Sequence, residues 1–158
     1  MFPLIRALTY ASLFVGLLLI VLPARVLEWS GVSRPTGLGV GQLAGATITL
    51  LGAALAVWCV VTFALVGHGT PAPFDPPRRL VVYGPYRFVR NPMYIGAGLA
   101  LLGATLFYES AALLAYTALF ALATVLFVRL YEERTLSRTF GAEYEEYRTR
   151  VGRWLPRR

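Results

Sequence analysis

The chain has 158 residues, a formal net charge of +7 and a mean hydropathy of +0.61, and 57% of its residues are hydrophobic. Soluble domains are about 45–50% apolar, so the composition indicates a membrane protein with one domain. A soluble bundle of this length would have to bury nearly every face of its helices, which argues against that class. All 15 basic residues are arginines that flank apolar segments, so nucleic acid is not an expected partner.

Four stretches without a charged residue predict an all-α integral membrane protein with four transmembrane helices. The uncharged stretches are residues 7–22, 35–67, 91–108 and 110–128. A membrane-spanning helix needs about 20 apolar residues. The predicted spans are residues 4–22, 40–66, 92–107 and 110–130.

The arginines predict the orientation. The loop 68–91 holds four arginines and one aspartate, and the tail from residue 129 onward holds eight arginines and five glutamates. The positive-inside rule places this loop, the tail 131–158 and the N-terminus in the cytoplasm, and four spans return the chain to its starting side.

Local signals predict how the polar segments are built. The loop is rich in proline and glycine up to residue 77, then reads as extended and ends in a turn at Gly84. Pro92 suits the first turn of the next helix, and Glu109 marks a tight hairpin. The fourth helix is expected to continue beyond the bilayer past Glu133 and to lead into a C-terminal amphipathic helix. The apolar residues of that helix repeat at helical spacing: Phe140, Tyr144, Tyr147 and Val151.

Glycines at four-residue spacing open the second predicted helix. Gly37, Gly41 and Gly45 would form a small-residue stripe that lets another helix approach closely. The same region imitates a dinucleotide-binding fingerprint. That fingerprint needs a preceding strand, which a membrane helix does not supply, so we interpret the glycines as helix packing.

The chemical groups available are concentrated in the two cytoplasmic segments. The chain has a single histidine and no cluster typical of metal ligands, so no metal site is predicted. It also lacks a phosphate-binding glycine-rich loop. What remains is arginines, a pair of glutamates, tyrosines and a backbone turn. These groups suit a ligand with a carboxylate, hydroxyls, an aromatic base and a positive centre.

Two sequence blocks carry a family resemblance that covers the chain from about Gly67 onward. The first block is Leu80-Val81-x-x-Gly84-Pro85-Tyr86-x-x-x-Arg90-Asn91-Pro92-x-Tyr94. The second is Glu132-Glu133-x-x-Leu136-x-x-x-Phe140-Gly141-x-x-Tyr144-x-x-Tyr147, closing with Leu155-Pro156. Together they resemble the isoprenylcysteine carboxyl methyltransferases and their bacterial relatives, which are related to the membrane phospholipid methyltransferases.

The resemblance implies an enzyme that moves a methyl group from S-adenosylmethionine to a membrane-associated acceptor by direct SN2 displacement. The implied acceptor is a lipid, an isoprenoid or fatty carboxylate, or a small thiol. The implied location is the cytoplasmic (inner) membrane of a bacterium. The implied cofactor contacts are Arg79, Leu80, Val81, Gly84, Tyr86, Asn91, Pro92, Met93, Tyr94 and Glu132. The residues expected to orient the acceptor are Arg90 and Arg129, and those expected to shape its pocket are Tyr144 and Tyr147.

Two departures from the eukaryotic members bear on the acceptor. Asn91 stands where those enzymes usually carry a histidine, and an asparagine amide cannot accept a proton. Val128 stands where they carry an acceptor-binding arginine, so a prenylcysteine acceptor does not follow from the resemblance.

Several alternatives remain open from the sequence alone. The chain could be an NADPH-dependent membrane reductase of the sterol-reductase type, or a membrane scaffold without catalysis. Glu133 could be a solvated charge paired with Arg129 one turn back, and Tyr144 and Tyr147 could be packing residues. Arg90 could anchor lipid headgroups. The sequence gives no prediction of the oligomeric state.

Overall fold

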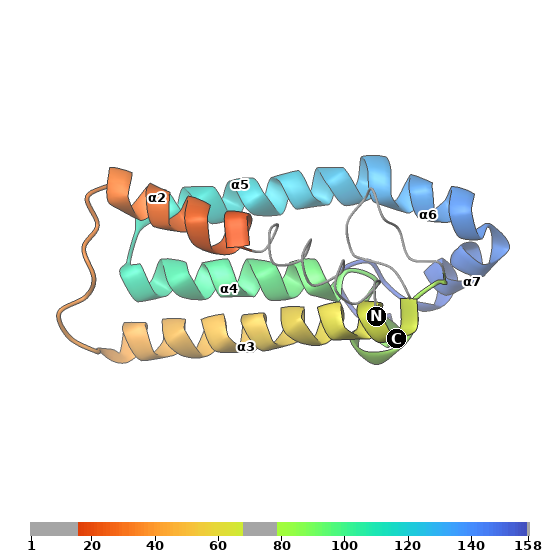
Figure 1. Cartoon of the computed structure of the whole chain (residues 1–158), viewed down its shortest axis with the longest axis horizontal. Helices are drawn as coiled ribbons and strands as arrows, with labels where there is room; N and C mark the ends of the chain where they lie inside the picture. Colours follow the sequence, from red (N-terminus) through yellow and green to blue (C-terminus); the bar gives the residue numbers. More distant parts are fainter. Residues whose placement is uncertain (1–15, 68–78, 158) are drawn as a thin grey trace.

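The computed structural model describes residues 16–67 and 79–157, and in this part of the chain the regular structure is helical (Figure 1). One isolated parallel bridge pairs Val89 with Gly152. The elements in chain order are η1 (Gly16–Val21), α2 (Leu22–Trp29), α3 (Val40–Thr62), η2 (Phe63–Gly67), η3 (Gly84–Arg87), α4 (Pro92–Tyr108), α5 (Ala111–Phe127), η4 (Val128–Glu132), α6 (Glu133–Phe140) and α7 (Ala142–Arg150). Of the η elements, η3 is a 3₁₀ turn and the others are π-helical.

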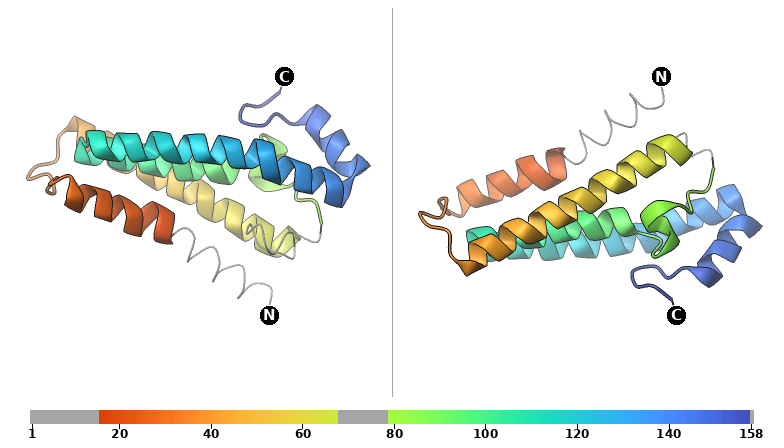
Figure 2. Two further views of the ribbon diagram at one scale, coloured as in Figure 1. Left: turned by 90° about the horizontal axis from the view of Figure 1, so that it is seen from above. Right: turned by 90° about the horizontal axis from the view of Figure 1, so that it is seen from below.

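The three long helices run side by side along the long axis of the molecule, with α4 between α3 and α5 (Figure 1). Two further views show the same rod-like arrangement, with α2 alongside the long helices (Figure 2). The segment 79–91, α6 and α7 gather at one end of the rod. The connection 30–39 and the turn between α4 and α5 lie at the other end. Both blocks of the family resemblance are therefore at the same end.

Small residues bring α3 and α4 into close contact. A Cβ added to Gly96 of α4 would lie 2.7 Å from the carbonyl oxygen of Gly52 in α3, and one added to Gly45 would lie 2.6 Å from the carbonyl oxygen of Gly103. Glycine is the residue that allows such backbone approach between helices. Of the predicted stripe, Gly45 makes this contact, whereas a Cβ at Gly37 would meet nothing within 4 Å.

Two helices are long and apolar enough to cross a membrane, namely Val40–Gly67 with 28 residues and Ala111–Phe140 with 30 residues. The first covers the predicted span 40–66, and the second covers 110–130 and continues beyond it, as expected. The apolar helix α4 has 17 residues and coincides with the predicted span 92–107. The predicted number of four membrane spans stays a prediction.

The first helix extends further than the predicted span 4–22, of which residues 4–15 lie outside the described part. The helical path formed by η1 and α2 continues past Pro23 and ends at Trp29. Pro23 occupies the first turn of α2, where the missing N–H of proline removes little hydrogen bonding. The first helix therefore continues beyond the predicted boundary at residue 22.

The tail differs from the single amphipathic helix that the sequence predicts. Gly141 has φ +51° and ψ −124°, a conformation that only glycine adopts readily, and it separates α6 from α7. Phe140 and Tyr144 therefore belong to different helices. They nevertheless converge, because both pack in one cluster around Leu80.

The predicted hairpin at Glu109 is confirmed. Glu109 has the left-handed φ of +48° that ends α4, and its carboxylate accepts a hydrogen bond of 3.0 Å from the Gln42 side chain. The hydroxyl of Ser110 caps α5 by accepting from the backbone N–H of Leu113 at 3.2 Å. The hydroxyls of Thr105 and Thr117 lie 3.1 Å apart and join the two buried helix faces.

Candidate functional site

The strand-like segment after residue 79 packs between two apolar clusters. Leu80 is buried against Tyr144 and Tyr147 of α7, whereas Val81 is buried against Cys59 of α3 and Tyr86. Successive residues of an extended chain point to opposite sides, which explains this division. The segment therefore fastens the tail to the long helices and fixes the start of the first sequence block.

The two sequence blocks meet at Tyr94 and Glu132. The Tyr94 hydroxyl, in the first turn of α4, donates a hydrogen bond of 3.0 Å to the Glu132 carboxylate at the end of η4. The two residues are 38 positions apart in the chain. Both side chains are half-buried. The α4–α5 hairpin thus brings together two residues that the family resemblance assigns to the same ligand.

Glu132 lies beyond the uncharged part of the α5 helix, which ends at Val128. Burial raises the pKa of its carboxyl to about 7, against the lowering effect of the Tyr94 hydrogen bond, and the neighbouring Glu133 raises it further. A carboxyl of this kind gains or loses its proton near neutral pH. Its capacity to accept hydrogen bonds from a ligand is therefore sensitive to pH.

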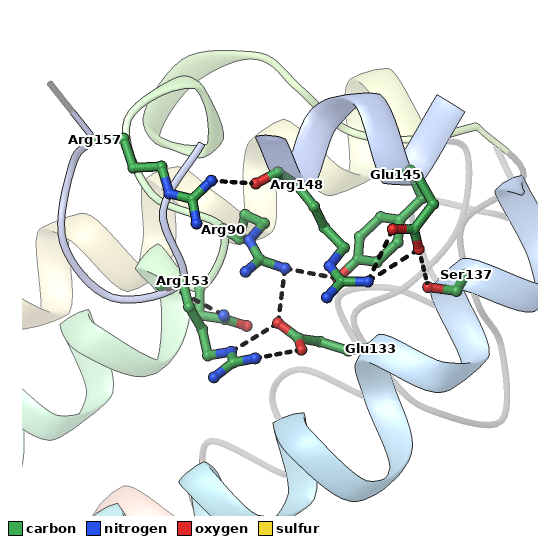
Figure 3. Close-up of polar contacts among 9 residues, drawn as sticks. Arg90, Glu133, Ser137, Glu145, Arg148, Arg153 and Arg157 are labelled. Carbon is green, nitrogen blue, oxygen red and sulfur yellow. Dashed lines mark hydrogen bonds and ion pairs between the residues drawn. The ribbon is translucent and has the colours of Figure 1, made fainter. Parts of the chain in front are cut away.

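Glu133 is the centre of a partly buried ion cluster. Its carboxylate lies 2.7 Å from the Arg90 guanidinium and binds Arg153 through two hydrogen bonds of 2.8 Å and 2.7 Å (Figure 3). Burial alone would raise the pKa of Glu133, but the Arg153 hydrogen bonds and the two positive charges hold it below its usual value. Arg90 also donates to the Tyr144 hydroxyl at 3.2 Å. We call Arg90, Glu133 and Arg153 the Glu133 clamp.

The chain after α7 folds back onto the first sequence block. The backbone N–H of Arg90 donates to the carbonyl of Gly152 at 2.8 Å, and the Asn91 side-chain amide donates to the carbonyl of Arg153 at 3.2 Å. The Tyr147 hydroxyl donates to the carbonyl of Tyr86 at 2.6 Å. These bonds join residues 86–91 to residues 147–153, two segments that are distant in sequence, at one end of the rod.

The residues predicted to handle the acceptor occupy different environments. Arg90, Tyr144 and Tyr147 are largely buried and hydrogen-bonded within the protein. Arg129, in η4, is exposed to the surroundings. The geometry thus gives three of the four a packing or pairing role in addition to the predicted one, and their contact with an acceptor stays a prediction.

The predicted cofactor residues cluster at the same end but do not all face one hollow. An open cavity of about 700 Å³ lies between η2, the segment 79–83 and the α6–α7 junction. Arg79 and Leu80 line it together with Phe140 and Glu143, whereas Tyr94 and Glu132 are not among its lining residues. Between the cavity-lining segment 79–83 and Tyr94 lie five further predicted contacts: Gly84, Tyr86, Asn91, Pro92 and Met93. The side chains of Tyr86, Asn91 and Pro92 are buried, so they support the surrounding segment by packing.

Sequence reasoning missed the importance of Arg153 and the partner of Glu133. The alternative that Glu133 is a solvated charge paired with Arg129 is wrong, because Glu133 pairs with Arg90 and Arg153, which lie 43 and 20 positions away. Helical spacing reports only neighbours on one helix. A signal was present in the excess of arginines after α7, but it did not identify a partner.

Comparison with known proteins identifies the family. Residues 40–143, more than half of the chain, match the phospholipid methyltransferase family. The chain belongs to this family. The match begins at the first residue of α3 and ends in the first turn of α7, so it includes both Tyr94 and Glu132.

Two curated relatives from Bradyrhizobium diazoefficiens are similar over shorter stretches. Methanethiol S-methyltransferase 2 is 39% identical over 75 residues, which cover 46% of this chain and 27% of that protein. Methanethiol S-methyltransferase 1 is 35% identical over 100 residues, which cover 61% of this chain and 31% of that protein. The matched stretches thus span less than a third of either relative. No solved structure matches the chain significantly.

The chain thus belongs to a family of methyltransferases and carries two helices that are long and apolar enough to cross a membrane. The predicted resemblance to the isoprenylcysteine carboxyl methyltransferases and their bacterial relatives is confirmed at the level of the family.

Proposed function

We propose that this chain transfers a methyl group from S-adenosylmethionine to a lipophilic acceptor at the cytoplasmic surface of the membrane. The observation that carries the proposal is the hydrogen bond between Tyr94 and Glu132, because it joins the two sequence blocks that the family resemblance assigns to the cofactor. Membership in the phospholipid methyltransferase family supports the same reaction class.

The residues at this end of the rod fit the polar groups of the cofactor. A carboxylate accepts at both oxygens, so Glu132 can bind a ribose hydroxyl or an ammonium while it keeps Tyr94. The Nε–H of Arg90 is buried and has no hydrogen-bond partner among the described residues. Such a donor is costly to leave unpaired, and a ligand carboxylate oxygen would satisfy it. The tyrosine faces suit an adenine ring or a sulfonium.

S-adenosylmethionine supplies a methyl group on a positively charged sulfur, which leaves as a neutral thioether after direct displacement by the acceptor. The task of the protein is then to bind, to orient and to exclude water. Holding the reacting groups in line lowers the activation free energy by roughly several kcal/mol, because it raises their effective concentration. Glu132 and Tyr94 would hold the donor, and the exposed Arg129 would orient an acceptor that arrives from the membrane surface.

For the acceptor, a small thiol that partitions into the membrane is the first candidate. Both curated relatives are named methanethiol S-methyltransferases, and two helices long and apolar enough to cross a membrane support an acceptor that arrives through lipid. Phospholipid headgroups and fatty or isoprenoid carboxylates are the other classes to compare. In each case the acceptor carries the nucleophile and the protein supplies the alignment.

The test is methyl transfer by detergent-purified protein with labelled S-adenosylmethionine. Small thiols, phospholipids and lipophilic carboxylates are offered separately, and products are identified by mass spectrometry. We expect a labelled product that Glu132→Ala abolishes and that Glu28→Ala, at the exposed opposite end, leaves unchanged. A protein that binds NADPH but not S-adenosylhomocysteine would instead be a reductase, and one that binds neither would contradict an enzymatic role.

A further inference from the structure

Glu133 joins parts of the site that lie far apart in the sequence. It comes directly after Glu132, and its carboxylate binds arginines from two distant segments. We propose that Glu133 is the positioning residue of the cofactor site, and that the Glu133 clamp makes the chain after α7 part of that site. This inference rests on the proposed function, because it concerns how the same site is held in shape.

The first step concerns the direction in which the two glutamates point. Neighbouring residues of a helix project about 100° apart, so fixing one side chain fixes the direction of the next. Glu133 is held by its two arginines on one side, and Glu132 points to Tyr94 on another. The helix is π-helical over Val128–Glu132, a local departure that is frequent at functional sites. The clamp therefore determines where the Glu132 carboxylate lies.

The second step concerns the energy of the cluster. The side chains of Arg90 and Glu133 are only 8% and 11% exposed, and that of Arg153 is 28% exposed. Removing one partner from such a cluster leaves buried charges without compensation, which is far more costly than losing a surface ion pair. The cluster has two positive charges for one negative charge, so loss of Glu133 would leave Arg90 and Arg153 facing each other. The clamp therefore resists rearrangement.

The third step links the clamp to the predicted cofactor residues. Arg153 binds Glu133 through its side chain and Asn91 through its carbonyl. Arg90 binds Glu133 through its side chain and Gly152 through its backbone N–H. Each arginine thus takes part in a contact between the residues after α7 and the loop that precedes α4. Movement of this terminal segment would displace Asn91 together with Glu132.

The experiment measures S-adenosylhomocysteine affinity by calorimetry at pH 8.5, where Glu132 is ionised. Glu133→Gln keeps the shape of the side chain and removes its charge. Arg153→Met removes the more exposed partner and leaves the Arg90 pair, in case Glu133→Gln fails to fold. The matched control is Glu146→Gln, which breaks an ion pair of 3.0 Å with Arg150 whose members are 68% and 69% exposed.

We expect Glu133→Gln and Arg153→Met each to weaken binding between about 10- and 100-fold, as displacement of a binding group does. Glu146→Gln should change the affinity for S-adenosylhomocysteine by less than about twofold. The double variant Glu133→Gln/Arg153→Met should have about the same affinity as the single variant that binds less tightly, because both substitutions act through one interaction. Arg153→Lys, which keeps the charge, should recover part of the affinity that Arg153→Met loses.

A pH titration separates positioning from general loss of structure. Glu133 contributes to the raised pKa of Glu132, so Glu133→Gln should move the pH midpoint of binding to a lower value. Unchanged affinity and an unchanged midpoint in folded Glu133→Gln, with wild-type binding intact, would overturn the inference alone. Absence of S-adenosylhomocysteine binding by the wild-type protein would instead contradict the proposed function.

Discussion

Two adjacent carboxylates have opposite electrostatic environments at this site. Glu133 is surrounded by arginines and keeps its charge, whereas Glu132 is partly buried beside a tyrosine and another carboxylate. Carboxyls whose pKa is raised by burial are concentrated at functional sites, and Glu132 has that environment. The sequence shows only two consecutive glutamates, so the division of roles depends on partners that the fold supplies.

The pKa of Glu132 predicts a pH-dependent affinity for S-adenosylhomocysteine. With a pKa raised to about 7, Glu132 is charged and accepts hydrogen bonds above that pH, and it is protonated below it. We expect affinity to fall as the pH is lowered from 8 to 6, with a midpoint at or somewhat below 7 because the ligand favours the charged form. Glu132→Gln should bind weakly and without this dependence. A wild-type affinity that is constant over the same range would contradict the assigned role.

At the scale of the elements, the close approach of α3 and α4 supports the site. The first turn of α4 carries Tyr94, and its position relative to α3 depends on backbone contacts at glycines such as Gly96 and Gly52. α5 approaches α4 through the buried Thr105–Thr117 pair, and its helical path continues through η4 to Glu132. A larger distance between these helices would therefore separate the two sequence blocks.

Two glycines in α4 provide a matched test of this packing. A Cβ at Gly96 would lie 2.7 Å from the Gly52 carbonyl oxygen and 2.8 Å from the Ala56 nitrogen, whereas one at Gly98 would meet nothing within 4 Å. We expect Gly96→Ala to lower the free energy of unfolding by about 1–3 kcal/mol through overpacking. Gly98→Ala should be neutral or stabilising by up to about 1 kcal/mol. Denaturation in detergent measures both, and equal effects would contradict the close helix contact.

Most helices could be predicted from the sequence, and the breaks could not. Pro92 and Glu109 delimit α4 because proline suits a first helical turn and a charge marks the end of an apolar run. The break at Gly141 was missed because the apolar spacing continues through it, and only the fold reveals the positive φ. The Tyr94–Glu132 pair could be expected from the family resemblance, but the partners of Glu133 could not, since they depend on where the tail folds back.

At the scale of the whole molecule, the rod has an apolar middle and a charged end. Large apolar side chains are exposed along the long helices, among them Leu50, Leu51, Leu119, Leu122 and Leu126. Lipid contact would account for this exposure, which is costly in water. The described part of the loop, residues 79–91, and the arginine-rich tail lie together at the end that carries the site. The positive-inside rule therefore predicts a cytoplasmic site.

Cysteine labelling tests that orientation. Cys59 is buried, so Cys59→Ala gives a background for single exposed cysteines. Ser30 and Thr139 are exposed at opposite ends of the rod. In spheroplasts, a membrane-impermeant maleimide should label Ser30→Cys directly and Thr139→Cys only after permeabilisation. Labelling of both from the same side would contradict the spanning arrangement, and the reverse pattern would contradict the predicted orientation.

The central claim is that Tyr94 and Glu132 hold one cofactor between two distant parts of the chain. Calorimetric titration of S-adenosylhomocysteine into detergent-purified wild type, Tyr94→Ala, Glu132→Ala and Glu28→Ala tests it most directly. We predict saturable binding to the wild type and to Glu28→Ala, and a loss of about 10-fold or more in each of the other two, as expected for hydrogen bonds that involve a charged group. Wild-type affinity in folded Tyr94→Ala and Glu132→Ala would contradict the account.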